Sequence, residues 1–135
     1  MTLSDIHGAL SRTAILLTFI LSFWGFFRFF RKEGVSSSYW GAMVIAEILY
    51  IAQGVIGVIL YILGERPAEW AHILYGVVSL LIIPGVFAYT KGDQTRRSML
   101  LYASFLLFLA VMFFRSVQTG GVSIAYVTHV IYFTL

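Results

Sequence analysis

The segment Trp70-Ala71-His72-Ile73-Leu74-Tyr75-Gly76-Val77-Val78-Ser79 opens the third long apolar stretch of the chain and indicates the kind of fold it adopts. His72 stands where the polar residues 64–69 give way to sequence that is soluble in hydrocarbon. In a helix of about 3.6 residues per turn, Gly76 and Ser79 follow His72 along one face. A histidine followed on its own face by small residues places an imidazole beside a shallow groove that suits a flat ligand.

The composition of the whole chain is that of an integral membrane protein. Of 135 residues, 60% are apolar and 11% are charged, and the mean hydropathy is +0.91. These values lie far from those of soluble domains, and the length suits one bundle covering residues 1–135. The absence of cysteine excludes disulfides, thiolate metal sites and thiol catalysis. The net charge of +3 comes from cations at the ends of apolar segments, so we expect no nucleic-acid partner.

Four apolar segments are each long enough to cross a lipid bilayer as a helix. We expect an all-α integral membrane four-helix bundle whose spans cover residues 7–30, 39–63, 68–89 and 98–116. Pro67 fits the start of the third helix, and Pro84 inside that helix predicts a kink. Residues 1–6 lack the basic region and cleavage site of a signal peptide, so we expect them in the mature chain.

The charged residues predict how the bundle is oriented. Basic residues concentrate after the first span and between the third and fourth, whereas the loop between the second and third carries Glu65, Arg66 and Glu69. The positive-inside rule therefore places both termini on the outer side of the membrane. We expect this membrane to be the plasma membrane of a prokaryote. Residues 120–135 are a short apolar C-terminal segment, too short for a standard span, which predicts an interfacial or re-entrant tail on the outer side.

A second histidine stands at the outer end of the first span. The helix face that starts at His7 continues through small residues, namely Ser11, Ala14 and Thr18. Because the first and third spans both begin outside, His7 and His72 should lie at similar depth. This arrangement is what a porphyrin needs when its iron is bound axially from both sides. We therefore expect His7 and His72 to be the metal ligands of one haem b, with Ser11 and Gly76 beside the macrocycle.

Three arginines at the same outer level are candidate partners for the haem propionates. Arg12 and Arg115 lie inside the ends of their spans, where an unpaired charge is costly, and Arg66 lies in the outer loop. A carboxylate partner would account for their positions. Each feature also has a structural reading, because arginines near span ends commonly extend to the interface and small-residue stripes commonly serve helix packing.

The run Gln53-Gly54-Val55-Ile56-Gly57-Val58 in the second span, followed by an outer loop and His72-Ile73-Leu74-Tyr75-Gly76, resembles one half of the haem A synthase family. The resemblance covers about residues 5–115 and implies a four-helix bundle. In it, His7 and His72 match the two haem-ligand positions, and Gln53 belongs to the pattern of the second helix. More loosely, the chain is similar to four-helix membrane b-type cytochromes.

Several positions differ from that family. The chain corresponds to one half rather than two, and it lacks the cysteine pair of the family's outer loop. Ser4 stands where an acidic residue is expected, with Asp5 out of register, and Gly8 stands where an arginine commonly follows the first histidine. These differences favour a haem-binding protein in electron transfer or haem handling. A half-size enzyme similar to haem A synthase stays an alternative.

Two further hypotheses involve other polar residues. Glu47 and Gln53, with Tyr50 and Tyr61 nearby, are the groups of the second span that a quinone or a proton path would use. His129 in the tail could join His7 and His72 in a three-histidine site for zinc or copper.

The remaining alternative needs no cofactor. The chain would then be a small subunit of a larger respiratory or redox membrane complex, or would form a homo-oligomer. An aromatic stripe on the first span would suit contact with lipid or with another subunit; it consists of Phe23, Phe26, Phe27 and Phe30.

Overall fold

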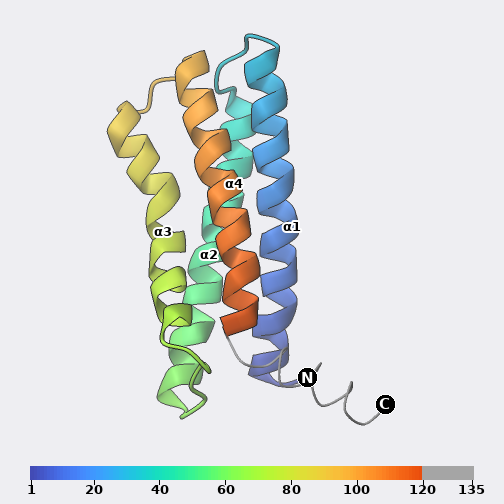
Figure 1. The fold of residues 1–135 in the computed structure, drawn as a ribbon, viewed down its shortest axis with the longest axis vertical. Helices are drawn as coiled ribbons and strands as arrows, with labels where there is room; N and C mark the ends of the chain where they lie inside the picture. Colours follow the sequence, from blue (N-terminus) through green and yellow to red (C-terminus); the bar gives the residue numbers. More distant parts are fainter. Residues whose placement is uncertain (120–135) are drawn as a thin grey trace.

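The computed structural model describes residues 1–119, and these residues form four helices joined by short loops (Figure 1). The helices are α1 (Leu3–Phe30), α2 (Ser37–Ile62), α3 (Ala71–Thr90) and α4 (Arg96–Thr119). The described residues contain no strand, and all four helices are long and apolar enough to cross a membrane. The prediction of an all-α membrane four-helix bundle is therefore confirmed. The predicted C-terminal tail, residues 120–135 with His129, lies outside the described residues.

All four helix starts differ from the expected bounds. α1 begins at Leu3, earlier than expected, because Thr2 and Asp5 form a reciprocal capping box (Thr2 N to Asp5 Oδ2 3.0 Å, Asp5 N to Thr2 Oγ1 3.1 Å). α2 begins at Ser37, two residues early, because the Ser36 hydroxyl accepts a hydrogen bond from the Tyr39 amide at 3.1 Å. α3 begins only at Ala71, so Pro67 lies in the preceding loop rather than in the helix. α4 begins at Arg96, where the Thr95 hydroxyl accepts a hydrogen bond from the Ser98 amide at 3.2 Å. 

The helices pack in a ring in which each contacts its neighbours in sequence order and α1 closes on α4. Within the described residues, the backbones of α1 and α3 do not approach each other closely, nor do those of α2 and α4, which meet only through side chains such as Tyr50 and Phe113. The helices α1 and α3 therefore face each other diagonally across the bundle. The most extensive contact is between α1 and α4, and the least extensive is between α2 and α3. The bundle is therefore tight along one side and loose along the other.

The tight side is built from small residues and buried hydrogen bonds. Ser22 donates to the Ala103 carbonyl at 2.9 Å, and the Tyr39 hydroxyl donates to the Leu21 carbonyl at 2.7 Å. Gly25 lies in the same contact, where a methyl group would approach the Tyr39 hydroxyl to 2.7 Å. In a membrane, close approach at small residues and interhelical hydrogen bonds are the main forces that hold helices together.

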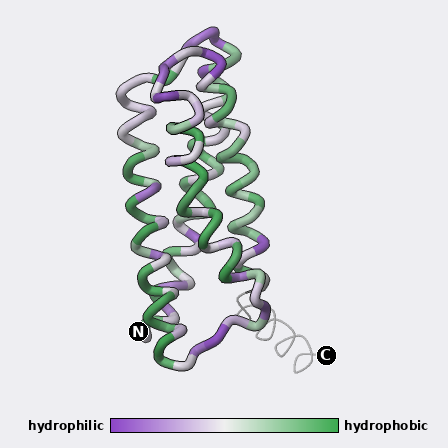
Figure 2. Tube along the Cα trace, turned by 90° about the vertical axis from the view of Figure 1, so that its left-hand side faces the viewer, coloured by the Kyte–Doolittle hydropathy of each residue, from purple (hydrophilic) through white to green (hydrophobic). Residues whose placement is uncertain are grey.

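Polar residues gather mainly at the two ends of the bundle, and the helix shafts between them are apolar (Figure 2). The N-terminus and the loop between α2 and α3 lie at one end, which we call the histidine end because His7 and His72 lie there (Figure 1). The opposite end carries six of the nine basic residues: Arg28, Arg31, Lys32, Lys91, Arg96 and Arg97. This distribution is the charge asymmetry on which the predicted orientation rests.

The loops at the end opposite the histidine end are joined by hydrogen bonds to backbone carbonyl groups. Arg28 donates twice to the Gly34 carbonyl, at 3.0 and 2.8 Å, and pairs with Glu33 at 3.0 Å. The Val35 amide donates to the Gln94 carbonyl at 3.1 Å, which joins the loop before α2 to the loop before α4. These contacts fix how the helix pairs meet at this end.

Asp93 in the last of these loops gives a pH-dependent prediction. Its carboxylate accepts hydrogen bonds from the hydroxyl of Ser98, the hydroxyl of Thr95 (2.8 Å) and the amide of Thr95 (3.1 Å), and these bonds lower the pKa of Asp93. A carboxyl whose pKa is lower in the folded state stabilises the fold above its unfolded pKa of about 3.9 and loses that contribution as the pH falls. We expect the melting temperature of Asp93→Asn in detergent to lie below that of the wild type at pH 7. The difference should shrink as the pH falls below about 4 and should close once the pH is below the lowered pKa of folded Asp93. A difference that is equal at both pH values would contradict this role.

Candidate functional site

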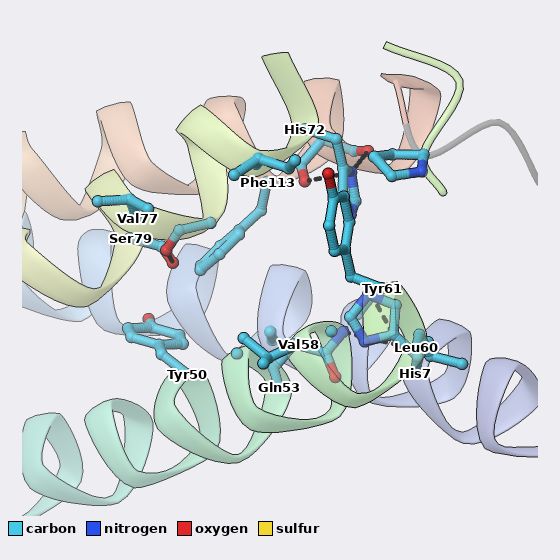
Figure 3. Close-up of a pocket in the computed structure, with 18 of the residues that line it drawn as sticks. His7, Tyr50, Gln53, Val58, Leu60, Tyr61, His72, Val77, Ser79 and Phe113 are labelled. Carbon is cyan, nitrogen blue, oxygen red and sulfur yellow. Dashed lines mark hydrogen bonds between the residues drawn. The ribbon is translucent and has the colours of Figure 1, made fainter. Parts of the chain in front are cut away.

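A cavity of about 740 Å³ opens at the histidine end and runs inward between all four helices (Figure 3). Its mouth is formed by Ser4, Glu65 and Pro67. Its inner part is lined by Tyr50, Ser79 and Phe113, whose side chains lie further along the helices than the two histidines in Figure 3. The volume falls within the range of about 300–1,000 Å³ that is typical of small-molecule and cofactor sites.

His7 from α1 and His72 from α3 face each other across this cavity. Their ring centres are 6.1 Å apart, and the ring planes are inclined at 66°. Both side chains are half-buried, and both line the cavity. Because α1 and α3 lie diagonally across the bundle, the two imidazoles meet at the cavity and not within the contact of two neighbouring helices.

The spacing of the two imidazoles fits a metal ion bound between them. A metal–imidazole bond of about 2.0 Å puts the nitrogens of two opposed ligands about 4 Å apart, and hence the ring centres roughly 6 Å apart. Within the described residues, no group of three or more His, Cys, Asp or Glu side chains could bind a metal. Two imidazoles would hold a metal whose other ligands are supplied from elsewhere, as they would be by haem.

The His72 ring is oriented by α4. Its Nδ1 lies 2.8 Å from the carbonyl oxygen of Ser116 and 3.2 Å from the Ser116 hydroxyl. Because a backbone carbonyl can only accept, Nδ1 is the protonated nitrogen in this contact, and Nε2 carries the lone pair. Metal-binding histidines are commonly fixed by this type of outer hydrogen bond, which sets the tautomer and the ring orientation.

The backbone of His7 is held by Gln53 from α2. The Gln53 amide nitrogen donates to the His7 carbonyl at 2.7 Å and to the Ser11 hydroxyl at 2.5 Å, and Ser11 donates to the same carbonyl at 2.8 Å. Gln53 and Ser11 therefore position the first turns of α1 against α2. Gln53, which was predicted to bind the cofactor, lines the cavity and bonds to the backbone of a candidate ligand.

Two buried polar atoms beside these contacts have no hydrogen-bond partner among the described residues. They are Nδ1 of His7 and Oε1 of Gln53. Burying a polar atom without a partner costs free energy, so such atoms point to a bound group or to ordered water. Both belong to residues that line the cavity, which is where a ligand would restore the missing interactions.

The small residues of the two stripes are placed differently from each other. Gly76 lines the cavity, and a methyl group added to it would have no atom within 4 Å, so its face is open. Ser11 also lines the cavity, but its hydroxyl is engaged by Gln53 and by the His7 carbonyl. Further in, Thr18 is fully buried and bonds to the Tyr50 hydroxyl at 2.5 Å, so the inner end of that stripe serves helix packing.

The predicted arginines do not line the cavity. Arg12 is exposed on α1, and Arg115 is exposed on α4, where it makes contacts of its own. Arg66 stacks on the ring of Tyr61 with 3.5 Å between the guanidinium carbon and the ring centre, and Tyr61 belongs to the cavity lining. Of the three, Arg66 is thus the one that the structure brings to the cavity, through its aromatic partner.

Two features of the site were missed by the sequence reasoning. The first is the Ser116 carbonyl that orients His72. Because every residue has a backbone carbonyl, the sequence gives no signal for this contact. The second is Phe113 on α4, whose ring packs at 5.0 Å on that of Tyr50, a residue already named in the second span, and lines the inner cavity with it. The apolar pattern of α4 indicates that Phe113 points into the bundle, but it does not indicate which residue Phe113 contacts.

No family model, curated protein or solved structure matches this chain. The class that the fold and the site define is thus a four-span membrane bundle with a two-histidine cavity at one end. The resemblance to the haem A synthase family stays a prediction, supported only by the residues that carry it.

Proposed function

We propose that the chain is a membrane b-type haem protein that binds one haem between His7 and His72 at the outer end of the bundle. The observation that carries the proposal is the opposition of two imidazoles, 6.1 Å apart, from diagonal helices across a cavity of about 740 Å³. The fixed tautomer of His72 and the unpartnered Nδ1 of His7 support the same reading. When bound, the haem would supply an iron that changes oxidation state.

The residues around the iron then have distinct tasks. His7 and His72 would bind it, Ser116 would hold the His72 ring, and Gln53 would position the α1 backbone that carries His7. The apolar inner wall would exclude water from the macrocycle, and the mouth of the cavity would receive the propionates. Both candidate ligands lie at one end of the bundle, so one haem there serves electron exchange or haem handling on that side.

This proposal is tested by adding haem to the detergent-purified protein and measuring the bound haem per chain. We expect about one haem per chain, because two axial ligands from one chain complete one iron site. A protein that takes up no haem, or that binds it without saturation, would contradict the proposal and favour a cofactor-free subunit.

Gly76→Leu tests the cavity without changing the candidate iron ligands His7 and His72. The added side chain enters space in which a first carbon meets no atom within 4 Å, and leucine favours a helix over glycine by roughly 1 kcal/mol. We therefore expect unchanged or higher thermal stability together with a loss of haem binding of at least about tenfold, equivalent to about 1.4 kcal/mol. The matched control is Gly85→Leu, at an exposed glycine of the same helix that is not part of the cavity and also has open space. Equal haem binding by the two variants would contradict the assignment of this cavity.

A further inference from the structure

Glu47 is a carboxyl group inside the membrane-spanning part of α2 that the proposed haem site does not use. At about 1.5 Å per residue it lies roughly 15 Å from the start of the helix at Ser37, well within a hydrocarbon layer of about 30 Å. The residues beside it, Val44, Ile45, Ile48 and Ile51, are exposed and face the surroundings of the bundle. The other acidic residues of the chain lie at the ends of the helices or in the loops: Asp5, Glu33, Glu65, Glu69 and Asp93.

The environment of Glu47 does not suit a carboxylate anion. Its Oε2 atom is buried and has no hydrogen-bond partner among the described residues, and no basic group forms an ion pair with it there. An unpaired charge at this depth is costly, and a buried carboxyl without a partner commonly keeps its proton.

No titratable group of the neighbouring helices is paired with Glu47. The titratable side chains of the two helices that pack on α2 are Asp5, His7, Arg12 and Arg28 on α1, and His72, Tyr75 and Tyr89 on α3. Among the described residues, none of these side chains forms a hydrogen bond or an ion pair with the Glu47 carboxyl. On its own helix, Tyr50 follows Glu47 by three residues and therefore lies one turn further along the same side.

Tyr50 connects this position to the cavity. Its ring lines the inner end of the cavity, and its hydroxyl is bonded to Thr18. The cavity thus reaches from the mouth at the histidine end to within one helical turn of Glu47, about 5 Å along the axis. Water in the cavity would bring protons to this depth.

We propose that Glu47 is an intramembrane proton-binding site that carries its proton in the resting protein and exchanges it with water through the cavity. In the exchange the carboxyl O–H bond breaks, the proton passes to a water molecule of the cavity, and a proton from that side restores the O–H bond. No oxidant or reductant takes part. The proposal does not rest on the haem, since it concerns the chain without any bound group.

The test is infrared spectroscopy of the haem-free protein in vesicles, in H₂O and after transfer to D₂O. We expect a carbonyl stretch of a protonated carboxylic acid at neutral pH, a shift of that band in D₂O, and loss of the band in Glu47→Gln. Glu69→Gln, at an exposed position of the same loop that does not line the cavity, is the matched control and should keep the band. Absence of the band in the wild type, or a band that persists in Glu47→Gln, would overturn the proposal.

The exchange route has its own test, made with Gly76→Leu. This variant narrows the cavity but leaves Glu47 and Tyr50 in place, so the band should remain and its shift in D₂O should slow several-fold. An exchange rate equal to that of the wild type would overturn the route through the cavity.

A chemical test covers the case in which Glu47→Gln does not fold. A hydrophobic carbodiimide adds to a protonated carboxyl group, and the product keeps the mass of the whole reagent. We expect labelling of the wild type at Glu47 and not at the five acidic residues near water, as read by mass spectrometry of peptides. Labelling that is absent at Glu47, or equal at all six, would overturn the proposal. None of these outcomes depends on haem uptake, so the two proposals can fail separately.

Discussion

Replacing either His7 or His72 by alanine is expected to abolish the binding of low-spin haem. Each change removes one of the two imidazoles that stand 6.1 Å apart in the cavity, and a single remaining ligand cannot complete the coordination of the iron. We expect the haem content after purification to fall at least about tenfold in each variant, which corresponds to about 1.4 kcal/mol or more of binding free energy. The measurement is the haem-to-protein ratio after loading with haem and gel filtration in detergent.

The controls for this prediction separate ligation from folding. His72→Ala also removes a hydrogen bond to the Ser116 carbonyl, worth about 1 kcal/mol, so the thermal stability of the haem-free variants should be measured in parallel. His129→Ala changes the remaining histidine, and we expect it to bind haem as the wild type does. Wild-type haem content in either His7→Ala or His72→Ala would show that the iron is bound elsewhere. Loss of haem in His129→Ala would show that the iron needs a histidine outside the pair His7 and His72.

Gly25→Leu is expected to have the largest effect on the stability of the fold. A first side-chain carbon at Gly25 would lie 2.7 Å from the Tyr39 hydroxyl, 2.9 Å from the methyl group of Ala103 and 3.0 Å from the end of Met99. Tyr39, Ala103 and Met99 are completely buried, so none of them can move aside without disturbing the core. Overpacking of a core typically costs about 1–3 kcal/mol, and a leucine here also forces α1 away from α4.

The measurement is thermal unfolding in detergent, followed by circular dichroism or by aggregation. We expect Gly25→Leu to unfold at a much lower temperature than the wild type or to fail to accumulate. Gly41→Leu is the matched control, because Gly41 is exposed on α2 and a carbon added there meets no atom within 4 Å. Equal stability of Gly25→Leu and Gly41→Leu would mean that α1 and α4 do not pack as closely as the structure shows.

The number and order of the spans could be predicted because hydrocarbon solubility is a property of whole segments. The opposition of His7 and His72 followed from the same property, since two helices that begin on one side place their first residues at one depth. The start of α1 could also have been found, because Thr2 and Asp5 have the spacing of a capping box. Pro67 was misplaced because proline fits both the first turn of a helix and the loop before it.

The side of each helix that meets a neighbour could not be predicted from the sequence alone. Arg12 follows Ser11 directly and therefore points about 100° away from it, so the depth of Arg12 was no guide to whether it reaches the cavity. The direction of Gln53 depends on where α1 lies, and its contact with the His7 carbonyl appears only when the two helices are packed. The role of Gly25 could not be predicted either, because it depends on side chains of α2 and α4 that approach α1 at this residue.

The looseness of the contact between α2 and α3 has a structural consequence for the site. These helices pack least extensively of the four neighbouring pairs, and the cavity lies where residues of both helices line it, including Gly54, Gly57 and Gly76. Tight packing between α1 and α4 holds the fold, so the opposite side can stay open for a ligand. In the proposed haem protein, the close contact of α1 with α4 would stabilise the fold, while the looser contact of α2 with α3 would leave room for the cavity.

The most direct test of the central proposal is the visible absorption spectrum of the haem-loaded protein, recorded oxidised and after reduction with dithionite. Two axial imidazoles predict a low-spin iron, with a sharp α-band in the reduced state and no change on adding carbon monoxide. A protein that stays colourless after loading, or that shows a five-coordinate, carbon monoxide-binding iron, would contradict ligation by His7 and His72.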